Sequence, residues 1–205
     1  RGSAGAKQGD FKASDPRLHA GPGKGRVRQA QAESQARRNV GILFDDNRLN
    51  DEIARNLRKL AEMQLADGAW PWFPGGRGNE YITLYITTGF GRLRHLGVDI
   101  RMDPAVRSLD RLDAWIDESY REILKHGRPE ENHLSPLIAF YLYGRSFFLK
   151  TADAPKAREA IDYFLGQAKK YWLQLESRQS KGHLALALKR FGDAQTATDI
   201  MKSIK

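Results

Sequence analysis

The histidines, carboxylates and serines are the residues of this chain that could do chemistry, and their spacing favours no catalytic or metal site. None of the histidines pairs with another at metal-ligand spacing; they are His19, His95, His126, His133 and His183. The Asp67 carboxyl lacks an evident second carboxylate, so we expect it to make a turn hydrogen bond. The serines fall in predicted helices or caps, with no nucleophile-elbow sequence. We therefore predict a protein that is not an enzyme and binds no metal or cofactor.

A loop dense in Gly, Pro and Trp, between residues 64 and 80, is the most distinctive stretch. Its side chains Trp70, Trp72 and Phe73 are large and apolar, so we expect the loop to fold back onto its flanking helices. The alternative is a ligand platform, such as the wall of a sugar cleft. The loop is also our predicted domain–domain contact. Its candidate interface residues are Asp67, Trp70, Trp72, Phe73, Arg77 and Tyr81.

Apolar residues spaced by three and four predict helices on both sides of this loop and on to the end of the chain. The expected helical ranges are 51–65, 81–96, 103–126, 135–148, 154–175, 180–191 and 193–204. We expect Asn50 to cap the first of these and Gly97 to close the second. The range that opens at Pro136 is apolar on most sides, which is typical of a deeply buried helix. Four tyrosines are expected in the core with their hydroxyls at its edge: Tyr81, Tyr85, Tyr141 and Tyr143.

Paired helices joined by short turns predict an all-α chain of antiparallel helical hairpins, forming an α/α toroid or part of one. We expect a partial toroid domain over residues 41–205 and a flexible basic leader over 1–40. Within the leader, residues 27–39 hold good helix formers but almost no apolar face, so they predict a marginal helix or none.

The formal charge of +9 is concentrated in the leader, where nine Lys or Arg face three acidic residues over residues 1–40. Such an arm could bind phosphate backbones or anionic lipid. No aromatic side chain interleaves with these charges after Phe11, so we expect a solvated tail and no specific nucleic-acid partner. No apolar run is long enough to cross a bilayer. Since the chain has no cysteine, it forms no disulfide and carries no thiol nucleophile.

Five segments resemble the helical thioester-domain region of bacterial alpha-2-macroglobulin-family proteins. They are Asp67–Gly76 (DGAWPWFPGG), Tyr81–Thr83 (YIT), Thr88–Leu93 (TGFGRL), Leu184–Gly192 (LALALKRFG) and Ile200–Lys205 (IMKSIK). The resemblance as a whole covers about residues 47 to 205. One departure matters most: without a cysteine, the thioester of that family cannot form within this chain.

The resemblance implies a toroid domain of a bacterial protein that entraps or inhibits proteases in the periplasm or at the cell envelope. Its implied partners are the other domains of a longer parent chain, with proteases as targets. Lacking the thioester, the domain would act by steric and interdomain contacts. His183 lies in the C-terminal match and is expected to be a helix-end or core-edge histidine. Two alternatives are a carbohydrate-active or carbohydrate-binding toroid that uses the loop from Trp70 to Trp72, and a basic-arm nucleic-acid binder.

Overall fold

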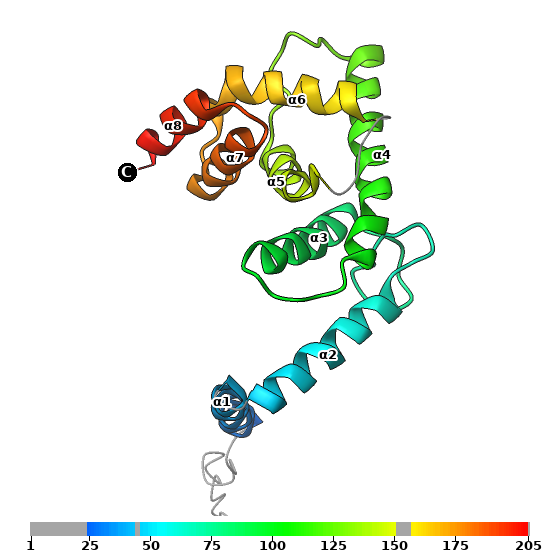
Figure 1. The fold of residues 1–205 in the computed structure, drawn as a ribbon, viewed down its shortest axis with the longest axis vertical. Helices are drawn as coiled ribbons and strands as arrows, with labels where there is room; N and C mark the ends of the chain where they lie inside the picture. The colour runs from blue at the N-terminus through cyan, green and yellow to red at the C-terminus, as the bar shows by residue number, and fades with distance from the viewer. Residues whose placement is uncertain (1–23, 44–45, 151–156, 205) are drawn as a thin grey trace, which may run out of the picture. The chain divides into compact units, whose positions relative to one another are not determined.

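The computed structural model describes residues 24–43, 46–150 and 157–204, and the secondary structure within these ranges is helical (Figure 1). The prediction of an all-α chain is confirmed. The α-helices are α1 (Lys24–Leu43), α2 (Asp46–Met63), α3 (Glu80–His95), α4 (Asp103–His126), α5 (Pro136–Arg145), α6 (Arg158–Tyr171), α7 (Arg178–Arg190) and α8 (Ala194–Ser203). Two short 3-10 helices, Ser146–Phe148 and Trp172–Gln174, extend α5 and α6.

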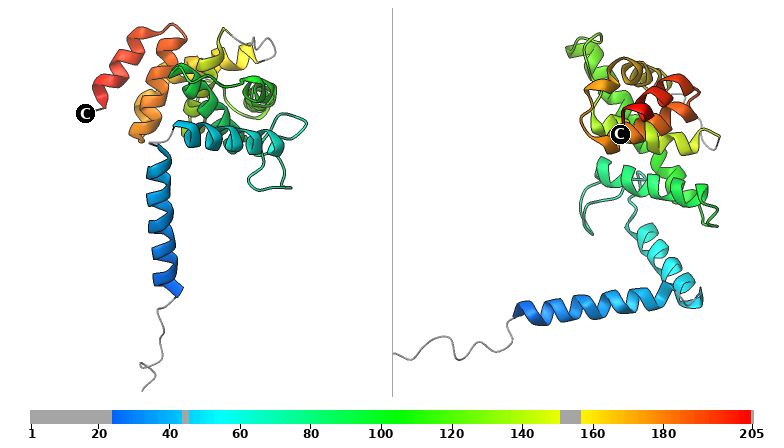
Figure 2. Two further views of the ribbon diagram at one scale, coloured as in Figure 1. Left: turned by 60° about the horizontal axis from the view of Figure 1, so that its bottom comes forward. Right: turned by 90° about the vertical axis from the view of Figure 1, so that its left-hand side faces the viewer.

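The chain divides into two compact units, Arg1–Asn56 and Leu57–Lys205. The first unit contains α1, which is one continuous helix (Figure 2). Over 27–39, where we expect a marginal helix or none, strong helix formers such as Ala, Gln and Arg carry a helix of 20 residues. The flexible leader that we expect lies outside the described residues for positions 1–23.

The helix that we expect from residue 51 begins earlier, at Asp46, so Asn50 lies inside α2 and is not its cap. The four residues before Asn50 are already part of the helix, so a cap residue at this position does not begin it. The apolar residues spaced by three and four in α2 differ in their surroundings. Leu57 and Leu60 pack against the smaller of two core clusters, while Ile53 is 37% exposed.

Local capping signals set most of the later helix ends. The Asn79 side chain accepts a hydrogen bond from the Ile82 N–H at 3.0 Å and begins α3. At the other end, Gly97 adopts φ +83°, and the Val98 N–H donates to the Leu93 carbonyl, as the expected glycine cap requires. The side chains of Ser135, Ser177 and Asp193 cap α5, α7 and α8 in the same way.

The second unit is built from hairpins arranged in two layers. Helices α3, α5 and α7 are successive neighbours, and each begins a hairpin whose second helix is α4, α6 or α8 (Figures 1 and 2). Helices α4 and α6 also touch each other. In Figure 1, α4 on the right, α6 at the top and α8 on the left follow one another around the outside of α3, α5 and α7.

Helix α5 lies at the centre of the larger core cluster, as its nearly all-round apolar pattern predicts. Ala139, Tyr141 and Leu142 are fully buried in it. Its Gly144 lets α3 approach closely, because a Cβ at this position would stand 2.9 Å from Leu84 Cδ1 and closer still to the Thr88 hydroxyl. The packing of α3 against α5 therefore depends on a small residue as well as on apolar ones.

No helix among the described residues is long and apolar enough to span a membrane.

Candidate functional site

The Gly/Trp loop, defined as residues 64–79 between α2 and α3, has a rigid base. Trp70 is fully buried and stacks on Phe90 with ring centroids 6.4 Å apart. Its backbone N–H donates to the Thr83 hydroxyl at 2.9 Å, and its carbonyl accepts from the Asn79 N–H at 2.9 Å. Across the base, Pro71 and Gly78 form an antiparallel bridge. These contacts join the two sides of the loop to each other and to the start of α3.

The other end of the base is fixed by Gly68, which adopts φ +84° beside α4. A Cβ there would lie 2.5 Å from the Arg107 carbonyl oxygen, so glycine is required by conformation and by space. The Gln64 amide donates to the carbonyls of Gly68 and Pro104 at 2.9 and 2.8 Å. As expected, an Asp67 carboxylate oxygen accepts a turn hydrogen bond, from the Ala69 N–H at 3.1 Å.

The tip of the loop carries two aromatic side chains into solvent. Trp72 is 66% exposed and Phe73 is 62% exposed, and Arg77 beside them is also exposed. The expectation that all three aromatic side chains fold back onto the helices is correct for Trp70 and wrong for Trp72 and Phe73. Two prolines and two glycines between residues 71 and 76 direct the chain away from the core after Pro71, so these side chains find no helix to cover them.

The six predicted interface residues therefore fall in three places. Trp70 is in the core, and Asp67 lies at the exposed base of the loop. Trp72, Phe73 and Arg77 lie together at the tip. Tyr81, at the start of α3, is 49% exposed and belongs to a groove that the sequence did not predict.

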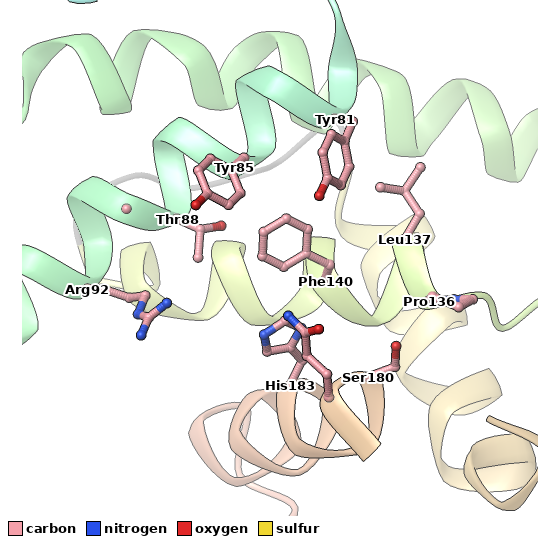
Figure 3. A pocket seen from close by; sticks show the side chains of 11 residues that line it. Tyr81, Tyr85, Thr88, Arg92, Pro136, Leu137, Phe140, Ser180 and His183 are labelled. Atoms are coloured by element: carbon pink, nitrogen blue, oxygen red, sulfur yellow. The ribbon is translucent and has the colours of Figure 1, made fainter. Parts of the chain in front are cut away.

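This groove runs across α3, α5 and α7 and encloses about 460 Å³ (Figure 3). Three helices contribute to it, each with one face. The lining residues are Tyr81, Tyr85, Thr88, Gly89 and Arg92 from α3, Pro136, Leu137 and Phe140 from α5, and Gln179, Ser180 and His183 from α7. We call it the three-helix groove.

A series of ring contacts crosses the three-helix groove. Tyr81 lies 6.4 Å from Tyr85 and 6.2 Å from Phe140, measured between ring centroids. Phe140 in turn stacks on His183 at 5.1 Å, and the His183 ring also stacks on Tyr143 at 4.6 Å. The imidazole thus contacts two aromatic rings at the edge of the core, as the sequence predicts for His183.

The charge in the groove is positive. Arg92 is the lining residue with a full charge, and no carboxylate lines the groove. Burial lowers the pKa of the His183 imidazole below its usual value, and the nearby Arg92 charge lowers it further. His183 is therefore mainly neutral near pH 7, and Arg92 supplies the cation at this end of the groove (Figure 3).

Sequence reasoning missed most of the groove because it assigned Tyr81 and Tyr85 to the core. The structure shows the reverse for α3, where Tyr85 is 62% exposed, whereas Tyr141 and Tyr143 of α5 are buried as expected. A signal was present in the spacing. Residues 81, 85, 88, 89 and 92 lie on one helical face, and that face ends in an arginine.

A buried polar cluster lies apart from the groove, between α4 and α5. The Tyr141 hydroxyl donates to Asp113 Oδ1 at 2.6 Å, and Arg145 Nε lies 3.2 and 3.3 Å from the two carboxylate oxygens. Burial raises the pKa of the Asp113 carboxyl, against the opposing effect of Arg145, and raises that of Tyr141 well above its usual value. Since all three side chains are buried, we assign this cluster to the core.

Within the described ranges, no group of three or more His, Asp or Glu side chains is placed to hold a metal ion. Comparisons with protein-family models, curated proteins and solved structures found no match for this chain.

Proposed function

We propose that this chain is a non-catalytic docking domain of a macroglobulin-like protein that entraps or inhibits proteases, in the periplasm or at the cell envelope. In this role the domain acts by steric and interdomain contacts, with the tip of the Gly/Trp loop as its contact point. The sequence resemblance motivates the family. The structural observation that carries the docking role is the exposure of Trp72 and Phe73 on a loop whose base is rigid.

Two features of the loop support docking. Large aromatic side chains are among the residues that contribute most to the binding energy of protein interfaces. When such side chains are exposed to water, a partner that covers them gains the free energy of burying their apolar surface. A loop that is already ordered loses little conformational entropy when a partner binds. Trp72 and Phe73 combine both features, because the buried Trp70 and the Pro71–Gly78 bridge order the backbone on either side of them.

We also propose that the two layers of the second unit form part of an α/α toroid. The observation behind this is the alternation of the hairpins, with α3, α5 and α7 in one layer and their partners in the other. Such an alternation continues into a closed ring when further hairpins follow the same curvature. A parent chain would supply those hairpins.

The structure weakens the sugar-binding alternative in the form that uses Trp70. A sugar platform needs an exposed ring face, and the Trp70 ring is fully buried against Phe90. The nucleic-acid alternative depends on the basic arm, most of which lies outside the described residues. The docking role is favoured because Trp72 and Phe73 are both exposed on a loop whose base is ordered.

The experiment uses the intact protein to which this chain belongs, mixed with a broad-specificity protease. Cleavage of a large protein substrate is compared with cleavage of a small peptide. For a steric trap we expect loss of the first and survival of the second. The double variant W72A/F73A should restore cleavage of the large substrate without changing the thermal unfolding midpoint.

The matched control is Leu173→Ala, which removes a side chain that is 68% exposed outside the loop. This variant should trap the protease as the unmodified protein does. Equal trapping by W72A/F73A would exclude docking through the loop. Cleavage of both substrates by the protease in the presence of the unmodified protein would exclude protease entrapment itself.

A further inference from the structure

We propose that the three-helix groove binds an acidic peptide segment in which a carboxylate side chain adjoins an aromatic or large aliphatic residue. This goes beyond docking through the Gly/Trp loop, since it concerns a different surface and a ligand of stated chemistry. The occupant is inferred from three properties of the groove: its size, its ring faces and its charge.

The size suits a short segment of chain. A volume of about 460 Å³ is within the range typical of sites that hold a small molecule or a few side chains. The groove is only partly enclosed and is lined by three helices, so a short segment of chain can enter it. A folded domain does not fit into such a volume, whereas one or two side chains of a peptide do.

The ring faces favour an apolar group in the ligand. Tyr81 and Tyr85 stand at the rim, 49% and 62% exposed, and Phe140 contacts both Tyr81 and His183. An aromatic or aliphatic side chain that enters here covers these rings and removes apolar surface from water. Offset or edge-to-face ring contacts would then hold an aromatic ligand side chain.

The charge favours a carboxylate. Arg92 is exposed, and no ion pair joins its guanidinium to the parts of the chain that the structure describes. No carboxylate lines the groove, so an acidic ligand meets no like charge there. The guanidinium fork can donate two parallel hydrogen bonds to a carboxylate, a geometry that suits an Asp or Glu side chain.

The remaining polar groups suit a peptide backbone better than a neutral sugar. The Gln179 amide both donates and accepts, as a peptide unit does, and the Tyr81 and Tyr85 hydroxyls can do either. A neutral sugar presents many hydroxyl donors, and the groove offers no carboxylate to accept from them. Acidic sugars share the carboxylate of the proposed peptide, so they belong among the outcomes of the test.

The experiment follows backbone amide shifts of the full chain by NMR during titration with acetyl-Gly-Glu-Phe-Glu-Gly-amide. We expect saturable shifts confined to α3, α5 and α7 around the groove. The Gln counterpart of this peptide, with both glutamates replaced, should bind more weakly. Arg92→Gln should weaken binding of the Glu peptide about fivefold, the size of an exposed ion pair, and abolish the difference between the two peptides.

Two further variants serve as controls. Arg101→Gln removes an exposed charge outside the groove and should leave the affinity unchanged. Tyr85→Ser, which removes an exposed ring at the rim, should weaken both peptides without lowering the thermal unfolding midpoint. The W72A/F73A variant should bind the Glu peptide with unchanged affinity. Peptide binding in the groove and docking through the Gly/Trp loop are therefore tested separately.

Three results would overturn peptide binding in the groove. The first is an absence of saturable shifts at millimolar peptide. The second is equal affinity for the Glu and Gln peptides, or for the unmodified chain and Arg92→Gln. The third is binding of tetragalacturonate in the groove when the peptide does not bind, which would assign the groove to acidic sugars.

Discussion

The indole nitrogen of Trp70 donates a hydrogen bond to the carbonyl oxygen of Leu60, 2.7 Å away. Leu60 lies in the last turn of α2, where carbonyl groups have no partner within the helix. A tryptophan from the following loop therefore caps the helix that precedes it. The same side chain fills the core beside Phe90, so one residue fixes both the end of α2 and the base of the Gly/Trp loop.

Trp70→Phe keeps an aromatic ring but removes the donor, leaving the Leu60 carbonyl without this partner. We expect a loss of about 1–3 kcal/mol in the free energy of unfolding. Trp70→Ala also leaves a cavity and should cost about 3–5 kcal/mol. Urea unfolding followed by far-UV circular dichroism measures both.

Trp72→Phe is the matched control and should stay within about 0.5 kcal/mol of the unmodified chain, because Trp72 is exposed. An equal loss in both phenylalanine variants would contradict the capping role.

Removing the Asp113 carboxylate should destabilise the chain strongly. Asp113→Ala takes away the acceptor of the Tyr141 hydroxyl and the ion-pair partner of Arg145, whose side chain is 3% exposed. Breaking a buried pair in this way typically costs about 3–5 kcal/mol. The control is Asp117→Ala, which breaks the surface pair with Arg121 on the same helix and should leave the unfolding midpoint nearly unchanged. Similar midpoints for the two variants would show that the buried pair contributes little.

Two glycines in helix interiors should respond to alanine in opposite directions. Gly144→Ala forces a methyl group against Thr88 and Leu84 and should cost about 1–3 kcal/mol. Gly182→Ala in α7 meets no atom within 4 Å and should stabilise by about 0.5–1 kcal/mol, through its better helix propensity. Thermal and urea unfolding distinguish the two. Adding Thr88→Ala to Gly144→Ala should recover part of the loss, and a failure to do so would place the clash elsewhere.

The stability of the chain should fall in acid partly because of His183. Burial and Arg92 lower its pKa in the folded chain below the value of 6.5 expected when unfolded. As the pH falls through 6.5, the unfolded chain takes up this proton first, so the free energy of unfolding decreases until the folded chain is protonated as well. His183→Gln should remove this part of the pH dependence. The check is the unfolding midpoint at about pH 7.5 and about pH 5, with His126→Gln as an exposed control. Equal pH dependence in the two variants would contradict the shift.

Much of the fold could be predicted because its signals are local. The Gly97 stop and the proline at the start of α5 each act within one helical turn. The errors are local as well. Asn50 has the chemistry of a cap but lies inside α2, because the residues before it are already helical.

The candidate sites could be predicted only in part. Trp72 was selected for its type, but its exposure depends on how far the loop projects beyond the helices it joins. The three-helix groove brings Tyr85, Phe140 and His183 together from positions far apart in the chain. No pattern of residues a few positions apart in the sequence shows that these three side chains lie close together.

By itself, the sequence determined the helical class, the positions of the hairpins and the identity of the Gly/Trp loop. It could do so because hydrophobic period, capping and turn chemistry act between residues a few positions apart. Only the tertiary structure decided which aromatic side chains are buried. Trp70 and Tyr141 lie in the core while Trp72 and Tyr85 face solvent. The reason is physical: burial of a ring depends on which helices pack against it, and that packing joins residues distant in the sequence.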